Sequence, residues 1–218
     1  MTDVERRYTP LVVELRADKD RKRIGGYAAV FNRESRNLGG FVEVVDRAAF
    51  NKSRGDGFPD VIARYNHDDN MLLGTVAAGT LRLSIDNTGL EYVVDPPDAR
   101  ADIVELVQRG DIRRSSFAFR TIEDDWTMTE QNFPKRTLLA AALVDVAPVN
   151  MPAYPDATAG LRSLADRFEA DLEEVRSLAE ANELRKFFVR TDGPVTKRET
   201  TLAQQRMALL ARRTDPYL

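Results

Sequence analysis

Between residues 8 and 150 the sequence is dominated by short runs of β-branched and aromatic residues, separated by Gly and Asp. Runs of this kind are typical of β-strands. Residues 79–95, "GTLRLSIDNTGLEYVVD", contain "NTG" between two alternating segments, which is a strong signal for a β-hairpin. Because most elements are strands and only one or two are helices, we expect a β-rich α+β chain, a barrel or sandwich decorated by helices.

The clearest helix of this region is predicted at residues 96–111, "PPDARADIVELVQRGD". Two prolines precede it, Asp98 or Asp102 is available as its cap, and Gly110 ends it. A second, short helix is expected at residues 47–53, capped by Asp46. The other strands are predicted at residues 8–18, 22–32, 39–46, 60–68, 115–126 and 135–149.

The pattern changes after residue 157. Apolar residues recur at helical spacing, with charges between them, from residue 160 to about residue 188. We therefore expect a β-rich domain over residues 1–158 and a separable helical tail over residues 159–218. Either the tail packs on a core of its own, or it is a coiled-coil or docking helix for a partner.

Composition excludes several classes of function. The 218 residues include no Cys, so thiol catalysis, disulfides and thiolate metal sites are excluded. The net charge of -3 gives no reason to expect nucleic-acid binding. The charged N-terminus shows no secretion signal, and no apolar run is long enough for a membrane span.

Several site motifs are also missing. No phosphate-binding glycine loop and no GxSxG elbow occur, so nucleotide binding and an ester hydrolase of the α/β type are not expected. With a single His and no Cys, a zinc site is not expected either, and Asp68 and Asp69 are interpreted as a solvated loop. We expect no cofactor and no metal.

His67 is the only histidine in the chain. If residues 61–67 are extended, His67 shares one face with Val61, Ala63 and Tyr65 and lies at the end of that face. An imidazole there is useful for proton transfer only if a suitable partner lies beside it. An ordinary polar residue where a strand meets a loop is the alternative.

The segment "RRSSFAFR" supplies a candidate partner. In a strand, Ser115 shares a face with Phe117 and Phe119, which we expect to face the core. Ser116 then faces outward beside the small Ala118, where its hydroxyl would be accessible and uncrowded. Both serines could equally be ordinary strand residues.

Asp145 interrupts an apolar strand, "LLAAALVDVAPV", where a carboxylate is costly to bury unless it is paired. Pairing with His67 is one solution, and a structural bond to backbone or to an arginine is another. Ser116, His67 and Asp145 together form a chemically complete set of nucleophile, base and orienting acid. Lysine is a less suitable base locally, since none lies between Lys52 and Lys135.

The chain resembles the HK97-type prohead (capsid maturation) proteases of tailed bacteriophages, over roughly residues 11–157. The ordered set is specific, above all N-H-D followed by L-G-T, then S-F-x-F, then P-A-Y-P. The matching stretches are "GGYAAVFN", "LGGFVEVVDRAAF", "RYNHDDNMLLGTVAAGTLRLSIDNTGL", "RGDIRRSSFAFR" and "LVDVAPVNMPAYPDA".

This resemblance implies a serine endopeptidase related to the herpesvirus assembly proteases, with a β-barrel surrounded by helices. The family's catalytic histidine falls on His67, its serine on Ser116 and its acid on Asp145, where relatives commonly carry Glu. Ala118 stands where Gly is expected. The oxyanion donors remain open between backbone N–H groups and the arginines at positions 113, 114 and 120.

The implied substrates are the scaffolding part of the major capsid protein and the enzyme itself, inside an immature capsid in the host cytoplasm. Neither a nucleic acid nor a membrane is an expected partner, and a homo-oligomer is left open. A non-catalytic scaffold or assembly protein on the same fold is the alternative function.

Overall fold

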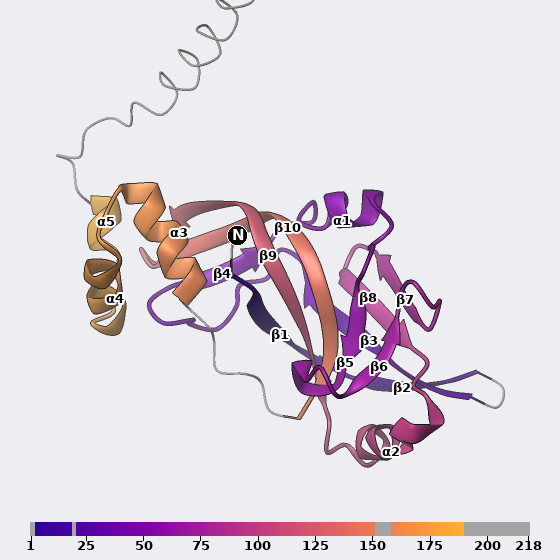
Figure 1. Cartoon of the computed structure of the whole chain (residues 1–218). Helices are drawn as coiled ribbons and strands as arrows, with labels where there is room; N and C mark the ends of the chain where they lie inside the picture. The colour runs from indigo at the N-terminus through magenta and orange to yellow at the C-terminus, as the bar shows by residue number, and fades with distance from the viewer. Residues whose placement is uncertain (1–2, 19–20, 151–157, 190–218) are drawn as a thin grey trace, which may run out of the picture. The chain divides into compact units, whose positions relative to one another are not determined.

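The structure is a computed structural model that describes residues 3–18, 21–150 and 158–189. Its strands form two sheets, in which the long antiparallel pair β9 and β10 is the dominant feature (Figure 1). The larger sheet has the order β1-β9-β10-β5-β6, with β4 also paired to β10. Its strands are β1 (Glu5–Val12), β4 (Val42–Val45), β5 (Ile62–Arg64), β6 (Leu72–Thr75), β9 (Arg114–Met128) and β10 (Pro134–Val149).

The smaller sheet has the order β2-β3-β8-β7 and is antiparallel throughout. Its strands are β2 (Glu14–Asp18), β3 (Arg21–Val30), β7 (Leu81–Ile85) and β8 (Gly89–Val94). The hairpin predicted at "NTG" is confirmed, because Ile85 pairs with Leu90 across that turn. The turn is held by Asp86, whose side chain accepts from the backbone N–H groups of Thr88 and Gly89.

The β-rich α+β class is confirmed, but the expected barrel is not found. Over the described residues both sheets are open, and a single parallel bridge between Phe31 and Val45 connects them. The predicted strand over residues 8–18 is in fact divided between the two sheets. It breaks at Val13, whose N–H bonds to the carbonyl of Arg113 instead of to a strand partner.

The helices of the β-rich part are short. They are α1 (Asn51–Gly55), α2 (Ala101–Arg109) and the 3₁₀ turns η1 (Tyr65–His67) and η2 (Asp98–Arg100). Gly110 ends α2 in the left-handed conformation, as predicted, but neither α1 nor α2 has a side-chain cap. Asp46 instead accepts from the backbone N–H of Ala48, within the turn before α1.

The main apolar core lies around the aromatic side chains of β9. Phe117 stacks on Phe119 with ring centroids 5.0 Å apart, and Phe50 meets Phe117 edge-on at 5.7 Å. Such contacts add to the area that each ring buries. The two phenylalanines of β9 therefore fix which face of that strand is the core face.

A buried cluster of charges lies toward the turn between β9 and β10. Arg136 is fully buried and bonds to Glu5, Glu43 and Asp124 at 2.5–3.0 Å. Arg7 bonds to the same two glutamates at 2.7–3.0 Å. We call these five residues the charge network. Burial acts to raise the pKa of Glu5, but the charge and hydrogen bond of Arg136 lower it on balance.

The residues after the sheets form α3 (Thr158–Phe168), α4 (Leu172–Glu180) and α5 (Lys186–Val189). The helical pattern is confirmed as two separate helices up to residue 180, because Glu169 is left-handed and Asp171 caps α4. Ser163 of α3 accepts from Trp126 Nε1 at 3.1 Å and donates to Asp124.

The described residues up to Arg185 form one compact unit, and α5 begins a second one. The helices α3 and α4 thus belong to the same unit as the sheets. The predicted boundary at residue 158 and the separable tail stay predictions, and the part of the expected tail from residue 190 onward lies outside the described residues. No helix of the described residues is long and apolar enough to cross a bilayer.

Candidate active site

Strand β9 positions the two serines on opposite faces, as alternation predicted. Ser115 is fully buried on the core side, where its hydroxyl lies 3.1 Å from the hydroxyl of Tyr92. Ser116 is paired with Tyr8 of β1 on one side and with Ala147 of β10 on the other. Its hydroxyl is therefore held on the middle strand of three, on the face away from the phenylalanines.

His67 lies on a turn and not at the end of a strand, so the expectation of an extended segment over residues 61–67 was wrong. Strand β5 ends at Arg64, and both Asn66 and His67 have left-handed backbones, with φ of 54° and 59°. Asn tolerates this conformation better than most residues. The Asn66 side chain also accepts from the backbone N–H of Asn150 at 3.1 Å, which ties the turn to the end of β10.

Asp145 is fully buried on β10, where it is aligned with Ala118 of β9 and Ile62 of β5. The register of β9 and β10 shifts between Leu143 and Asp145, so the strands are irregular at the position of the carboxylate. The carboxylate of Asp145 is therefore in the apolar surroundings that the sequence predicted, where it needs hydrogen-bond or charged partners.

The structure brings the three predicted side chains together. Nε2 of His67 lies 2.6 Å from Oγ of Ser116, and Nδ1 of His67 lies 2.6 Å from Oδ1 of Asp145. Ser116 on β9 and Asp145 on β10 are 29 positions apart in the sequence. His67 comes from a third element, the 3₁₀ turn η1. We call these three residues the relay.

The ionisation of Asp145 determines the tautomer of His67. Burial acts to raise the pKa of Asp145, but the hydrogen bonds and charges of His67 and Arg64 lower it on balance. An ionised carboxylate has no proton to donate, so Nδ1 of His67 must donate to it. In the neutral imidazole Nε2 is then the acceptor, which faces the hydroxyl of Ser116.

The Ser116 hydroxyl has a second acceptor, the backbone carbonyl of Arg7, at 2.8 Å. Because a hydroxyl has one proton, it donates either to this carbonyl or to Nε2 of His67. A neutral imidazole can accept the proton. A protonated imidazole instead donates to Oγ, and the hydroxyl then turns to the carbonyl. The site therefore has a defined hydrogen-bond arrangement for each protonation state of His67.

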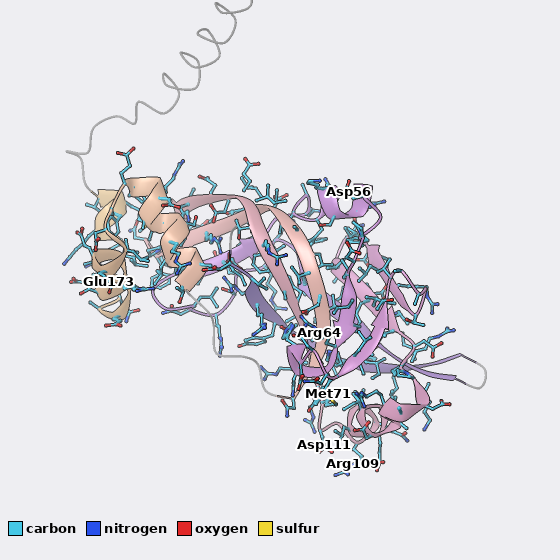
Figure 2. The ribbon with its side chains drawn as sticks, viewed as in Figure 1. Asp56, Arg64, Met71, Arg109, Asp111 and Glu173 are labelled. Carbon is cyan, nitrogen blue, oxygen red and sulfur yellow. The ribbon has the colours of Figure 1, made fainter. Side chains whose placement is uncertain are left out.

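Arg64 is a further member of the site, and the sequence pattern did not predict its role. It is the last residue of β5, its side chain is 11% exposed, and it bonds to Asp145 Oδ2 and to Asp69. Figure 2 labels Arg64 in the region where β5 meets β10. An extended strand would put Arg64 and His67 on opposite faces, and only the turn at Asn66 lets both reach Asp145.

The site is more enclosed than expected. Ser116 is 3% exposed, although alternation indicated an accessible hydroxyl. Alternation correctly identified the face of the strand but not what covers that face. His67 lies against the hydroxyl, and the neighbouring strands β1 and β10 flank it.

The three arginines considered as oxyanion donors lie in different places. Arg113 bonds to the carbonyl of Gly110 at 2.5 Å, and Arg114 lies over the ring of Tyr8 at 5.6 Å. Arg120 is exposed, four residues beyond Ser116. Arg114 thus lies closest to the hydroxyl along β9, and its side chain is on the same face.

Acidic residues near His67 are used in turn geometry and ion pairing. Asp68 accepts from the backbone N–H of Asn70 at 2.8 Å, and Asp69 bonds to Arg64. Within the described part of the chain no three His, Cys, Asp or Glu side chains gather as metal ligands would.

A hydroxyl, an imidazole and a buried carboxylate in this order are the groups by which serine hydrolases activate their nucleophile. The geometry on this β-rich fold therefore fits the class of serine hydrolases. The chain belongs to the Caudovirus prohead serine protease family, whose model matches residues 11–170. No curated protein and no solved structure matches the chain. The resemblance to the prohead proteases is thereby confirmed.

Proposed function

We propose that this chain is a serine endopeptidase of capsid maturation, in which Ser116 is the nucleophile, His67 the general base and Asp145 the acid that orients it. The observation that carries the proposal is the continuous relay, with both hydrogen bonds at 2.6 Å. Membership of a family of prohead serine proteases supports the same reaction class.

The reaction follows from the protons of the relay. Ser116 Oγ bonds to the carbonyl carbon of the substrate peptide, while the hydroxyl proton moves to Nε2 of His67. The imidazolium gives this proton to the amide nitrogen as the C–N bond breaks. The amine departs, and the acyl group of the substrate remains bound to Ser116 as an ester. Water then attacks the ester carbonyl while His67 takes one of its protons. His67 returns this proton to Oγ as the C–Oγ bond breaks, which releases the carboxyl product and restores Ser116. Asp145 holds the ring and stabilises its positive charge.

The substrates we propose are the major capsid protein with its scaffolding segment and the chain itself, cleaved inside the immature capsid in the host cytoplasm. Family membership supports this substrate class. The residues from 159 onward dock the enzyme to the scaffold or are removed by self-cleavage. The change in composition after residue 157 supports a separate role for them.

Co-expression with the major capsid protein of the same phage tests the proposal. Wild type should shorten the capsid protein, and Ser116→Ala should leave it uncut, as read by mass spectrometry. Ser115→Ala is the matched control: it makes the same change one residue away and should still cut. It should melt at a lower temperature than wild type, because Tyr92 loses its hydroxyl partner.

Two results would contradict the assignment. Normal processing by Ser116→Ala would rule out Ser116 as the nucleophile. Correctly assembled but uncut capsids with wild type would favour the non-catalytic assembly protein instead.

A further inference from the structure

A cavity of about 330 Å³ lies along β1, next to the strand that carries Ser116. This volume is at the lower end of the range for ligand pockets. Four exposed arginines line it, and we call the cavity the arginine pocket. The four are Arg6, Arg33, Arg36 and Arg114.

The positive charge of the arginine pocket is not neutralised by the residues around it. In the described ranges none of the four arginines lies within ion-pair distance of a carboxylate. Of the two acids that line the cavity, Glu43 is buried and bonded to Arg7 and Arg136, and only Glu34 is exposed. The pocket therefore carries a net positive charge and attracts anions.

Two of the guanidinium groups converge on one aromatic ring. Arg36 lies 4.7 Å and Arg114 lies 5.6 Å from the ring centroid of Tyr8, so the two charges are within about 10 Å of each other. Like charges at this distance repel each other. A carboxylate bound beside either group would reduce that repulsion and accept charge-assisted hydrogen bonds from it.

The arginine pocket is close to the proposed nucleophile. Tyr8 is the cross-strand neighbour of Ser116, and Arg114 precedes Ser116 by two residues on the same face of β9. Tyr8 is thus about 5 Å and Arg114 about 7 Å from Ser116 between Cα atoms. An extended peptide spans this distance in two or three residues.

The position of β1 also suits an extended ligand. It is the terminal strand of the larger sheet, and the pocket runs along it. Terminal strands can bind a peptide by adding it as a further strand, with side-chain pockets that supply the specificity. We infer that the arginine pocket binds an acidic side chain of the substrate, located within about three residues of the bond that is cut. This inference rests on the proposed function.

A peptide library derived from a proteome, digested by the full-length chain, tests the inference. Wild type should cut preferentially where Asp or Glu lies within three residues of the bond, and added salt should weaken the preference. In Arg33→Gln/Arg36→Gln the ratio of acidic to neutral sites should fall about tenfold, because charge-assisted bonds are lost. Arg54→Gln, which changes an exposed arginine of α1, should keep the wild-type ratio.

The outcomes separate the two proposals. Cleavage by wild type with no excess of Asp or Glu would contradict the arginine pocket and leave the protease assignment intact. An unchanged ratio in the double variant would also contradict it. Cleavage by Ser116→Ala in the same assay would instead contradict the proposed function.

Discussion

Strands β9 and β10 carry two buried polar clusters of different character. In the charge network every carboxylate meets a guanidinium, and the members Glu5, Arg7, Glu43 and Arg136 all come from strands. In the relay a neutral hydroxyl has two acceptors, and His67 lies on a left-handed backbone.

The difference indicates what each cluster is for. Paired opposite charges on regular strands have no alternative arrangement, so the charge network has a structural role. The relay has one hydrogen-bond arrangement for each protonation state of His67. It also contains a strained, left-handed backbone, which costs on the order of 1–3 kcal/mol per residue. Strain is retained where function requires a particular geometry. Changes in the relay should therefore affect rate, and changes in the charge network should affect stability.

The largest effect on rate, after loss of the nucleophile or of the general base, is expected for Asp145→Asn. Activity should fall about 10²- to 10⁴-fold, because an amide neither fixes the tautomer of His67 nor stabilises its charge. Asp69→Asn is the matched control, since Asp69 also bonds to Arg64 but is exposed, and it should lose little activity. Initial rates of capsid-peptide cleavage measure both variants. A wild-type rate in Asp145→Asn would make Asp145 a structural residue.

The largest effect on stability is expected for Arg136→Met. Removing this fully buried cation leaves Glu5 and Glu43 partly unpaired, which should cost about 3–5 kcal/mol of unfolding free energy. Urea unfolding measures the loss. Arg82→Met, at an exposed position of β7, should change stability by no more than about 0.5 kcal/mol. A loss below about 1 kcal/mol in Arg136→Met would remove the contrast between the two clusters.

Arg64→Gln should have a smaller effect that distinguishes a positioning role from a structural one. We expect kcat to fall about tenfold with KM unchanged, because Asp145 loses the partner of its second oxygen. Arg64→Lys should recover part of the loss, since it keeps the charge but not the forked geometry. Equal kcat in wild type and Arg64→Gln would contradict a positioning role.

Arg64→Gln should also change the stability of the fold at low pH. The pKa of Asp145 is held below its ordinary value of 3.8, so its ionised form adds stability above that pH. This contribution is lost as pH falls through the lowered pKa. Without Arg64 the pKa of Asp145 rises, so the contribution is smaller and is lost completely at a higher pH. Thermal melts between about pH 2 and pH 5 would reveal the difference.

Strand periodicity accounts for what the sequence predicted correctly. Phe117 and Phe119 identified the core face of β9, and strand alternation then placed Ser115 on that face and Ser116 on the other. The hairpin at "NTG" and the end of α2 at Gly110 were also correct, because both depend on local backbone preferences.

Predictions from strand periodicity were wrong where the backbone is not in the β conformation. The left-handed Asn66 and His67 cannot be derived from alternation, and this concealed the contact between Arg64 and Asp145. The Asn next to the His was the only local signal for such a turn. The prediction of a barrel was wrong for another reason. Closure of a sheet depends on contacts between its distant edges, and the local sequence pattern does not determine these contacts.

Activation of the Ser116 hydroxyl by His67 and Asp145 underlies the proposed reaction. Labelling with a fluorophosphonate probe, followed by peptide mapping, measures this activation. We expect one labelled site, Ser116, with labelling lost in His67→Ala and retained in Ser115→Ala. Labelling at another residue, or equal labelling of wild type and His67→Ala, would contradict it.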